Sequence, residues 1–161
     1  LHHMDNPMDG WKVLVDCLKD GGLIKTGLYS ELARQHVVEI RQEISQSGIG
    51  SSDLEMKSFR TGIIESDKVH HKQIIRSPDF YSLSNFRDLM FHVSEQHLTI
   101  PEISSFMAHN SLIFHGFQIP IDIAKGYPDG DARVDLERWQ EFETAHPETF
   151  KGMYVFWCRK G

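Results

Sequence analysis

Leu18-Lys-Asp-Gly-Gly-Leu-Ile-Lys-Thr-Gly-Leu-Tyr-Ser30 contains a helix end, a turn and a strand in direct succession. Gly21-Gly22 is expected to end the preceding helix, because glycine adopts a left-handed backbone conformation without steric cost. Leu23–Tyr29 has the length and the glycine boundary of a short strand, and Ser30 is expected to cap the helix that follows. A strand held between two helices indicates an α/β fold.

Further helices and strands are predicted on both sides of this segment. Asn6-Pro7 has the residue types of a helix start, and the capping-box spacing of Thr99-Ile-Pro-Glu102 predicts another. The remaining predicted elements are a helix from Ser30 to about Ser47, a strand over Leu112–Ile119, a helix over Leu136–Ala145 and a final strand over Met153–Cys158. Both faces of the final strand carry apolar side chains, which predicts that the strand is covered on both sides.

The segment Gly50–Phe91 differs from the rest of the chain. It carries short helical patterns that are broken by Ser77-Pro78. We therefore expect residues 50–91 to form a helical insertion or lid rather than part of the sheet.

Composition sets limits on location and partners. The 161 residues are 40% hydrophobic and 25% charged, as in a globular domain. The formal net charge of -6 makes nucleic acid an unlikely partner. No apolar run approaches the roughly 20 residues of a membrane span, and no signal peptide is visible. With only Cys17 and Cys158 available, a disulfide framework is not expected, and the prediction is a cytoplasmic protein.

Ten histidines are a high count for this length, and two of them begin the chain in Leu1-His-His-Met4. One interpretation is the remnant of a polyhistidine tag. The other places His2 and His3 at the carboxyl end of a strand, the edge where open α/β sheets bind ligands. An imidazole there can act as a general base or orient a substrate.

His92, Glu95 and His97 raise the possibility of a metal site. Their spacing brings only two side chains together in either a helix or a strand, whereas zinc needs three or four converging ligands. His70-His71 are adjacent and expected to face different directions. We therefore predict no metal site, and interpret Glu95 and His97 as a pair, either in a substrate pocket or in a structural hydrogen bond.

Two residues near the predicted strand end have open interpretations. Tyr29 and Ser30 either line a pocket or serve for packing and helix capping, and the two roles are compatible. Arg34, one turn further on, is expected to be a solvated or ion-paired surface residue.

Several segments resemble known proteins in the same order along the chain. Leu1-His-His-Met4 and Leu18-Lys-Asp-Gly-Gly-Leu-Ile24 resemble the second half of a class I S-adenosylmethionine-dependent methyltransferase, with Asp20 in place of the proline of the family's turn. Four segments resemble a subgroup of that family often fused to tetratricopeptide repeats: Gly27–Arg34, Arg87–Glu95, Leu98–Met107 and Phe150–Trp157.

This resemblance implies that residues 1–161 are the C-terminal portion of a methyltransferase domain with a partial Rossmann-like sheet. The sheet would hold the end of the fourth strand, the fifth strand, and an antiparallel sixth and seventh strand. The implied cofactor is S-adenosylmethionine, but the family's glycine-rich loop and ribose-binding acid are expected upstream of Leu1. We therefore expect this chain to be inactive alone, with an N-terminal methyltransferase half or a tetratricopeptide-repeat region as partner.

The resemblance also suggests roles for the candidate residues. His2 and His3 are expected to be catalytic, and the expected substrate-binding residues are Tyr29, Ser30, His92 and Glu95. The methyl acceptor is not identified by the sequence. Two other functions remain open: a catalytically inactive, methyltransferase-like binding or interaction module, and a metal-dependent enzyme using His92, Glu95 and His97.

Overall fold

The computed structural model describes residues 1, 3–92, 95–127 and 130–161. The chain forms two compact units. The first, here called the sheet unit, consists of Leu1–Arg34 and Ser94–Gly161, and the second, the helical unit, of Gln35–Val93. The helical unit thus includes residues 35–49 as well as the predicted insertion, whose function as a lid stays a prediction.

Four strands form one mixed sheet in the order β2-β1-β4-β3. Their bounds are β1 (Leu23–Ser30), β2 (His97–Leu98), β3 (Leu112–Phe117) and β4 (Met153–Lys160). β2 is parallel to β1, with Tyr29 opposite His97, whereas β4 is antiparallel to both of its neighbours. The predicted antiparallel pairing of the last two strands is confirmed.

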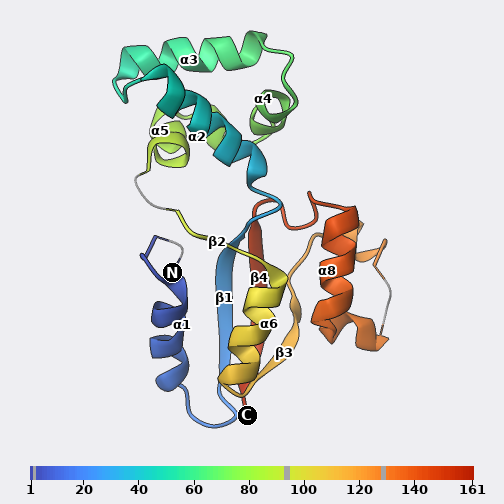
Figure 1. The fold of residues 1–161 in the computed structure, drawn as a ribbon. Coiled ribbons are helices and arrows are strands. Elements are labelled where there is room, and N and C mark those ends of the chain that lie inside the picture. Colours follow the sequence, from blue (N-terminus) through green and yellow to red (C-terminus); the bar gives the residue numbers. More distant parts are fainter. Residues whose placement is uncertain (2, 93–94, 128–129) are drawn as a thin grey trace. The chain divides into compact units, whose positions relative to one another are not determined.

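The helices of the sheet unit are α1 (Pro7–Asp16), α6 (Ile100–His109), α7 (Ile121–Ala124) and α8 (Leu136–Ala145), with a short 3-10 helix at Gly130–Val134 (Figure 1). The predicted starts of two helices are confirmed. Asn6 Oδ1 accepts the backbone N–H of Met8 at 3.1 Å, and Thr99 forms the predicted capping box with Glu102. These side chains satisfy amide groups that a helix start leaves without intrahelical partners.

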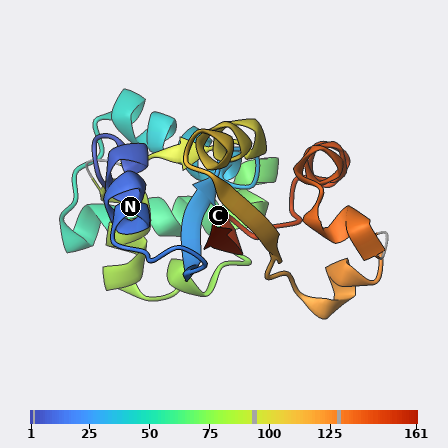
Figure 2. The same cartoon turned by 90° about the horizontal axis from the view of Figure 1, so that it is seen from below.

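One face of the sheet is buried under α1, α6 and α8. Trp11 of α1 stacks on Phe106 of α6 with ring centroids 4.1 Å apart, and meets Phe156 of β4 edge-on at 5.6 Å. Trp139 of α8 belongs to the same apolar cluster. Figure 2, seen from below, shows β1 and β4 adjacent, with α6 beside the sheet.

The opposite face of the sheet is open at several positions. Tyr154, Phe156 and Cys158 of β4 are fully buried, but Trp157 between them is 43% exposed. Leu23 of β1 is exposed as well. The prediction that the final strand is covered on both faces is therefore wrong, because the helices that supply its cover pack on one side.

Two local predictions near β1 are also wrong. α1 ends at Asp16, before Gly21-Gly22, and Gly21 instead adopts φ +75° in the turn that leads into β1. The predicted helix start at Ser30 is wrong, because Ser30 is the last residue of β1 and α2 begins at Gln35. Ser30 Oγ nevertheless accepts the Ala33 N–H at 3.1 Å, the hydrogen bond expected of a cap, in the turn before α2. β2 was not predicted, because a two-residue strand has no detectable periodicity.

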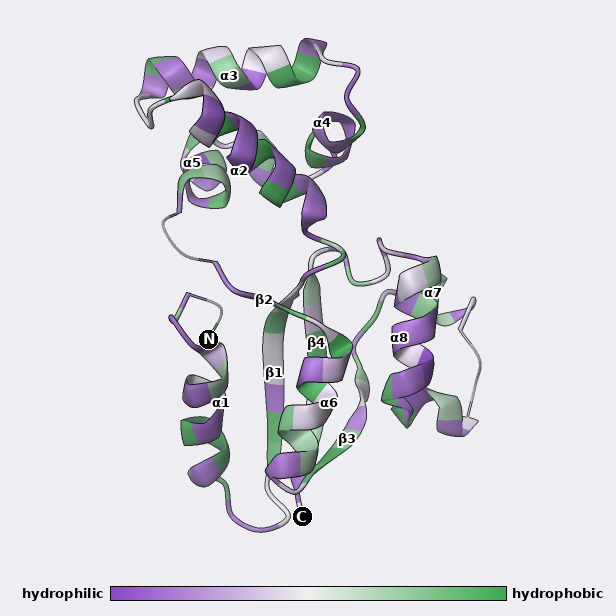
Figure 3. Cartoon of the chain, viewed as in Figure 1, coloured by the Kyte–Doolittle hydropathy of each residue, from purple (hydrophilic) through white to green (hydrophobic). Residues whose placement is uncertain are grey.

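The helical unit has a core of its own. Its helices are α2 (Gln35–Ser47), α3 (Asp53–Glu65), α4 (Val69–Ile74) and α5 (Leu83–Phe91), with a 3-10 turn at Pro78–Phe80. Ile40, Met56, Ile63, Phe80 and Phe86 are all fully buried in one cluster. Figure 3 shows apolar and polar residues side by side along α2 and α3, as expected for helices buried on one face.

Among the described residues, no helix has both the length and the apolar character to cross a membrane.

The one-sided core predicts unequal effects for two tryptophans. Trp11→Ala should lower the free energy of unfolding by about 3–5 kcal/mol, because it removes a fully buried indole. The matched variant Trp157→Ala, on the open face, should change it by about 0.5 kcal/mol or less. Urea denaturation followed by circular dichroism measures both values, and equal losses would contradict the one-sided core.

Candidate functional site

Five side chains of the sheet unit gather at the carboxyl end of β1, and we call them the Tyr29 cluster: His3, Tyr29, Arg34, Glu95 and His97. The Arg34 guanidinium lies 3.9 Å from the centre of the Tyr29 ring. The rings of His3 and His97 meet the Tyr29 ring edge-on, at centroid distances of 6.4 and 6.3 Å. Tyr29 is half-buried and His3 is exposed, whereas the side chains of Glu95, Arg34 and His97 are only 3%, 11% and 15% exposed.

The backbone explains why these residues meet. β1 and β2 are parallel and place Tyr29 directly opposite His97. After β1 the chain turns at once, and the Arg34 N–H donates to the Ser30 carbonyl at 3.2 Å. Gly152 adopts φ +102° beside this turn, and a Cβ there would lie 3.5 Å from Cγ of Arg34. That distance is an ordinary van der Waals contact, so it is the positive φ, and not the space beside Arg34, that favours glycine here.

Glu95 joins two residues of the cluster. Its Oε1 forms an ion pair with Nε of Arg34 and lies 2.7 Å from Nε2 of His97. Because a carboxylate only accepts hydrogen bonds, Nε2 of His97 carries a proton. In the neutral ring the lone pair then resides on Nδ1, which is the atom that can take up a proton. The predicted pairing of Glu95 with His97 is confirmed.

A second polar cluster lies in the core directly behind Tyr29. Ser30 Oγ donates to Glu143 Oε1 at 2.7 Å and accepts the N–H of Ala33 at 3.1 Å. The Tyr154 hydroxyl donates to Glu143, with oxygen distances of 2.8 and 2.9 Å. All three side chains are at most 1% exposed. Glu143 thereby ties α8 to β1 and β4.

Burial controls the ionisation of this buried cluster. It raises the pKa of Glu143, against the opposing effect of the hydrogen bonds from Ser30 and Tyr154. Burial also raises the pKa of Tyr154, so its hydroxyl stays protonated and remains a donor. The arrangement is a carboxyl group solvated by hydroxyl donors instead of water.

The predicted site residues have different places in the structure. His2 lies outside the described residues. His3, Tyr29 and Glu95 belong to the Tyr29 cluster, whereas Ser30 points into the core. His92 follows α5 in the helical unit. Their roles in catalysis or substrate binding stay predictions.

Sequence reasoning missed several polar residues. Arg34 is ion-paired, with Glu95, as one of its two interpretations predicted, but at 9% exposure it is not a surface residue: the Tyr29 ring and Glu95 enclose it. No sequence pattern pointed to Glu143 or Tyr154, because Glu143 lies in a polar helix and Tyr154 in an apolar strand. Only a three-dimensional arrangement brings residues so far apart in the chain together.

The expected divergence of His70 and His71 is also wrong. Their Nε2 atoms each lie 2.8 Å from an oxygen of Glu43 in α2. Both side chains belong to the helical unit, and they form a candidate metal centre. The prediction of no metal site assumed, in part, that the side chains of His70 and His71 face different directions, and the structure does not show this.

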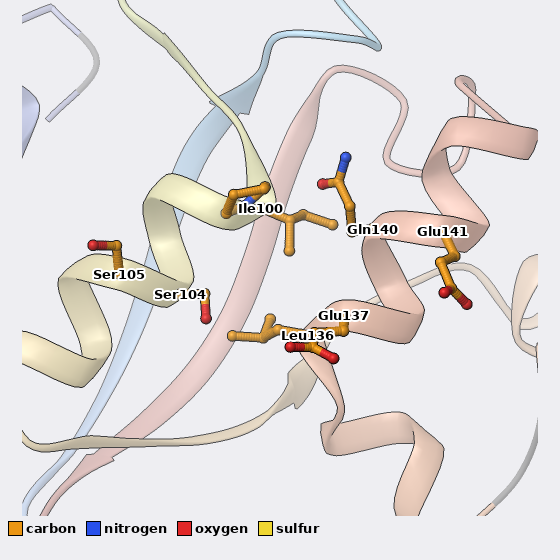
Figure 4. A pocket seen from close by; sticks show the side chains of 8 residues that line it. Ile100, Ser104, Ser105, Leu136, Glu137, Gln140 and Glu141 are labelled. Carbon is orange, nitrogen blue, oxygen red and sulfur yellow. The ribbon is translucent and has the colours of Figure 1, made fainter.

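A groove of about 560 Å³ runs between α6 and α8. Figure 4 shows Ile100 and Leu136 directed toward the space between the two helices, with Ser104 near its edge. None of the residues predicted to be catalytic or substrate-binding lines this groove, so it is distinct from the Tyr29 cluster.

Comparison with known proteins supports the fold assignment. No family model matches the sequence. Among solved structures, the chain is similar to PKMT2 from Rickettsia typhi, a protein-lysine methyltransferase, with a TM-score of 0.62 and 12% identity. The match covers 94% of this chain and 31% of PKMT2. The chain thus has a methyltransferase-like fold and spans about a third of that protein's length.

The sequence resemblance implied S-adenosylmethionine as the cofactor, and this stays a prediction. In Rossmann-like sheets such a ligand is held by a glycine-rich loop after the carboxyl end of a strand. In the described chain, β1 is followed by Glu31–Arg34 and parallel β2 by Thr99, and neither connection contains glycine. The described residues at this edge therefore contain no glycine-rich loop of this kind.

The buried cluster predicts a stability loss for Tyr154→Phe. The variant keeps the ring but removes a donor to Glu143, so the free energy of unfolding should fall by about 1–3 kcal/mol. The matched control Tyr81→Phe alters an exposed tyrosine and should have an effect of at most about 0.5 kcal/mol. Urea denaturation at neutral pH compares them, and equal effects would exclude a stabilising bond at Glu143.

Glu143 should also make stability depend on pH. Its folded-state pKa lies above the ordinary value of 4.5, so its contribution is fully present below that pH and is lost as the pH rises through the folded-state pKa. Glu143→Gln removes this titration. The free energy of unfolding of the variant, relative to the unmodified chain, should therefore rise as the pH increases above 4.5.

The control for this experiment is Glu141→Gln, an exposed glutamate on the same helix. Urea denaturation at a series of pH values should give curves for the control and the unmodified chain that run parallel. A Glu143→Gln curve parallel to both would contradict the upward pKa shift.

Proposed function

We propose that this chain is part of an S-adenosylmethionine-dependent methyltransferase of class I type, and that the Tyr29 cluster receives the methyl acceptor. The proposal extends the methyltransferase-like fold. The observation that carries it is the gathering of ionisable and aromatic side chains at the carboxyl end of β1. Ligands of open α/β sheets bind at this edge.

In this proposal the cofactor is held by further parts of a longer protein. The open face of the sheet supports this, because Leu23 and Trp157 are 58% and 43% exposed there, whereas both faces of Rossmann-like sheets are normally covered. The fold resemblance also favours an N-terminal methyltransferase half as this partner. Tetratricopeptide repeats are a further candidate partner.

Each residue of the Tyr29 cluster has a proposed role. Glu95 fixes the proton of His97 on Nε2, which leaves Nδ1 to accept a proton from the acceptor as it becomes a nucleophile. Arg34 holds Glu95 in position through their ion pair. The Tyr29 ring and His3 form an aromatic wall that orients the acceptor.

The acceptor that we propose is a lysine amine of a protein. PKMT2 is a protein-lysine methyltransferase, which makes this acceptor the first to test. The net charge of -6 favours encounter with a basic protein. An aromatic ring beside a carboxylate also suits a cationic side chain, as the binding of Arg34 by Tyr29 and Glu95 illustrates.

The proposed proton acceptor is tested by His97→Gln in the full-length protein. Loss of a general base should lower kcat by about 10²- to 10⁴-fold. The matched control His109→Gln replaces an exposed histidine of α6 and should leave kcat unchanged.

The assay follows methyl transfer from labelled S-adenosylmethionine to a lysine-rich protein, with RNA and a metabolite mixture as alternative acceptors. Labelling of RNA or metabolites alone would overturn the lysine assignment. If no acceptor is labelled although the full-length protein binds S-adenosylmethionine, the inactive binding module is the better account.

Calorimetry compares the binding of S-adenosylmethionine by this chain with its binding by the full-length protein. The chain of residues 1–161 should show no binding of S-adenosylmethionine, whereas the full-length protein should bind it, because the described strand ends lack a glycine-rich loop. Tight binding by the isolated chain would contradict the proposed division of the cofactor site.

A further inference from the structure

Three side chains of the helical unit converge on a small volume. Glu43 is in α2, and His70 and His71 are in the first turn of α4. Glu43 Oε1 lies 2.8 Å from Nε2 of His70, and Oε2 lies 2.8 Å from Nε2 of His71. One candidate donor atom from each residue lies within 4.8 Å of the others. The cluster is well shielded, because the His71 and His70 side chains are 6% and 17% exposed.

Hydrogen bonding constrains the ring of His70. Its Nδ1 lies 2.8 Å from Oε2 of Glu39, and its Nε2 contacts Glu43. Carboxylates only accept hydrogen bonds, so both ring nitrogens must bind a proton or another cation. A metal ion at Nε2 replaces one proton while the contact with Glu39 is kept. That contact is the carboxylate–histidine pair that orients histidine ligands in metal sites.

We propose that Glu43, His70 and His71 bind a divalent transition metal ion, with zinc as the best match. Two imidazole nitrogens and a carboxylate are a common zinc ligand set, with a fourth position open to water or a ligand. Donor atoms of a tetrahedral zinc site are about 3.3 Å apart. Each 2.8 Å contact between Glu43 and a histidine therefore has to open by about half an ångström, while the three donor atoms stay within the 4.8 Å that they span here.

Two further features of the cluster oppose metal binding. Nζ of Lys68 lies 2.7 Å from Oε1 of Glu43 and competes as a cation. The Lys68 side chain is 55% exposed, so it can move into solvent when a metal binds. Nδ1 of His71 is buried without a hydrogen-bond partner in the described structure. When a metal takes Nε2, the proton of the neutral ring moves to Nδ1, and that unpaired N–H lowers the affinity.

The carboxylate is already in the form that a metal needs. Burial raises the pKa of Glu43, but the hydrogen bonds from Lys68, His70 and His71 outweigh this effect and lower it to about 2. Glu43 is therefore ionised at neutral pH. Glu43 therefore loses no proton when a metal binds, whereas an imidazole nitrogen that carries a proton must lose it.

The test is titration of the 161-residue chain with Zn²⁺ alone by calorimetry, and with Co²⁺ by visible absorption. All proteins carry His2→Ala and His3→Ala, so that the terminal histidines cannot bind the metal. We expect one equivalent of Zn²⁺ to bind and Co²⁺ to give the intense bands of a tetrahedral site. Absence of both signals overturns the proposal.

Variants then distinguish a metal site from an ion-pair network. Glu39→Gln should weaken binding by about 10- to 100-fold, as expected for a carboxylate that orients a ligand. His70→Gln and Glu43→Gln remove ligands and should weaken it further. Lys68→Ala should strengthen binding, because it removes a competing cation from Glu43.

A control lies in the other unit of the chain. His109→Ala replaces an exposed histidine of the sheet unit and should leave zinc affinity unchanged. Circular dichroism verifies the fold of each variant, and His70→Gln is preferred to substitution of the more deeply buried His71. Undiminished binding by folded His70→Gln and Glu43→Gln, or weaker binding by Lys68→Ala, would assign the metal to another place.

Discussion

The sheet unit depends on the burial of one carboxyl group. Glu143 lies at the centre of the contact between α8 and the sheet, and its donors are the hydroxyls of Ser30 and Tyr154. An unpaired carboxylate in this position would be strongly destabilising, so the three residues must keep their mutual positions. Because Ser30 is the last residue of β1, the same network fixes the point at which the strand ends and the turn toward Arg34 begins.

The two faces of β1 connect this core network to the candidate site. Ser30 points into the core and Tyr29 to the other side, as alternation along a strand requires. The parallel pairing with β2 then places His97 opposite Tyr29 and Glu95 close to Arg34. Tyr29 and His97 are therefore held on paired strands, the condition under which side chains can act together on a ligand, while His3, Arg34 and Glu95 join them from turns and connecting segments. The zinc proposal is independent of this cluster, because its ligands lie in the helical unit.

Local signals in the sequence predicted most elements, since a capping box or a strand pattern depends on neighbouring residues. The helix that begins after Thr99 and the strand that begins at Leu23 are examples. The polar clusters depend on residues far apart in the chain: Ser30 and Glu143 are separated by 113 positions. Glu95 with His97 was found because they are two residues apart. The approach of His70 and His71 to Glu43 was missed, because spacing alone does not fix side-chain direction.

The most direct test of the methyltransferase account is a crystal structure of the full-length protein with S-adenosylhomocysteine bound. The account predicts that the sulfur of this product faces the carboxyl end of β1, with Tyr29 and His97 on the acceptor side. It further predicts that most contacts to the nucleoside come from residues outside this chain. A ligand bound at the opposite end of the sheet, or held entirely by residues 1–161, would contradict it.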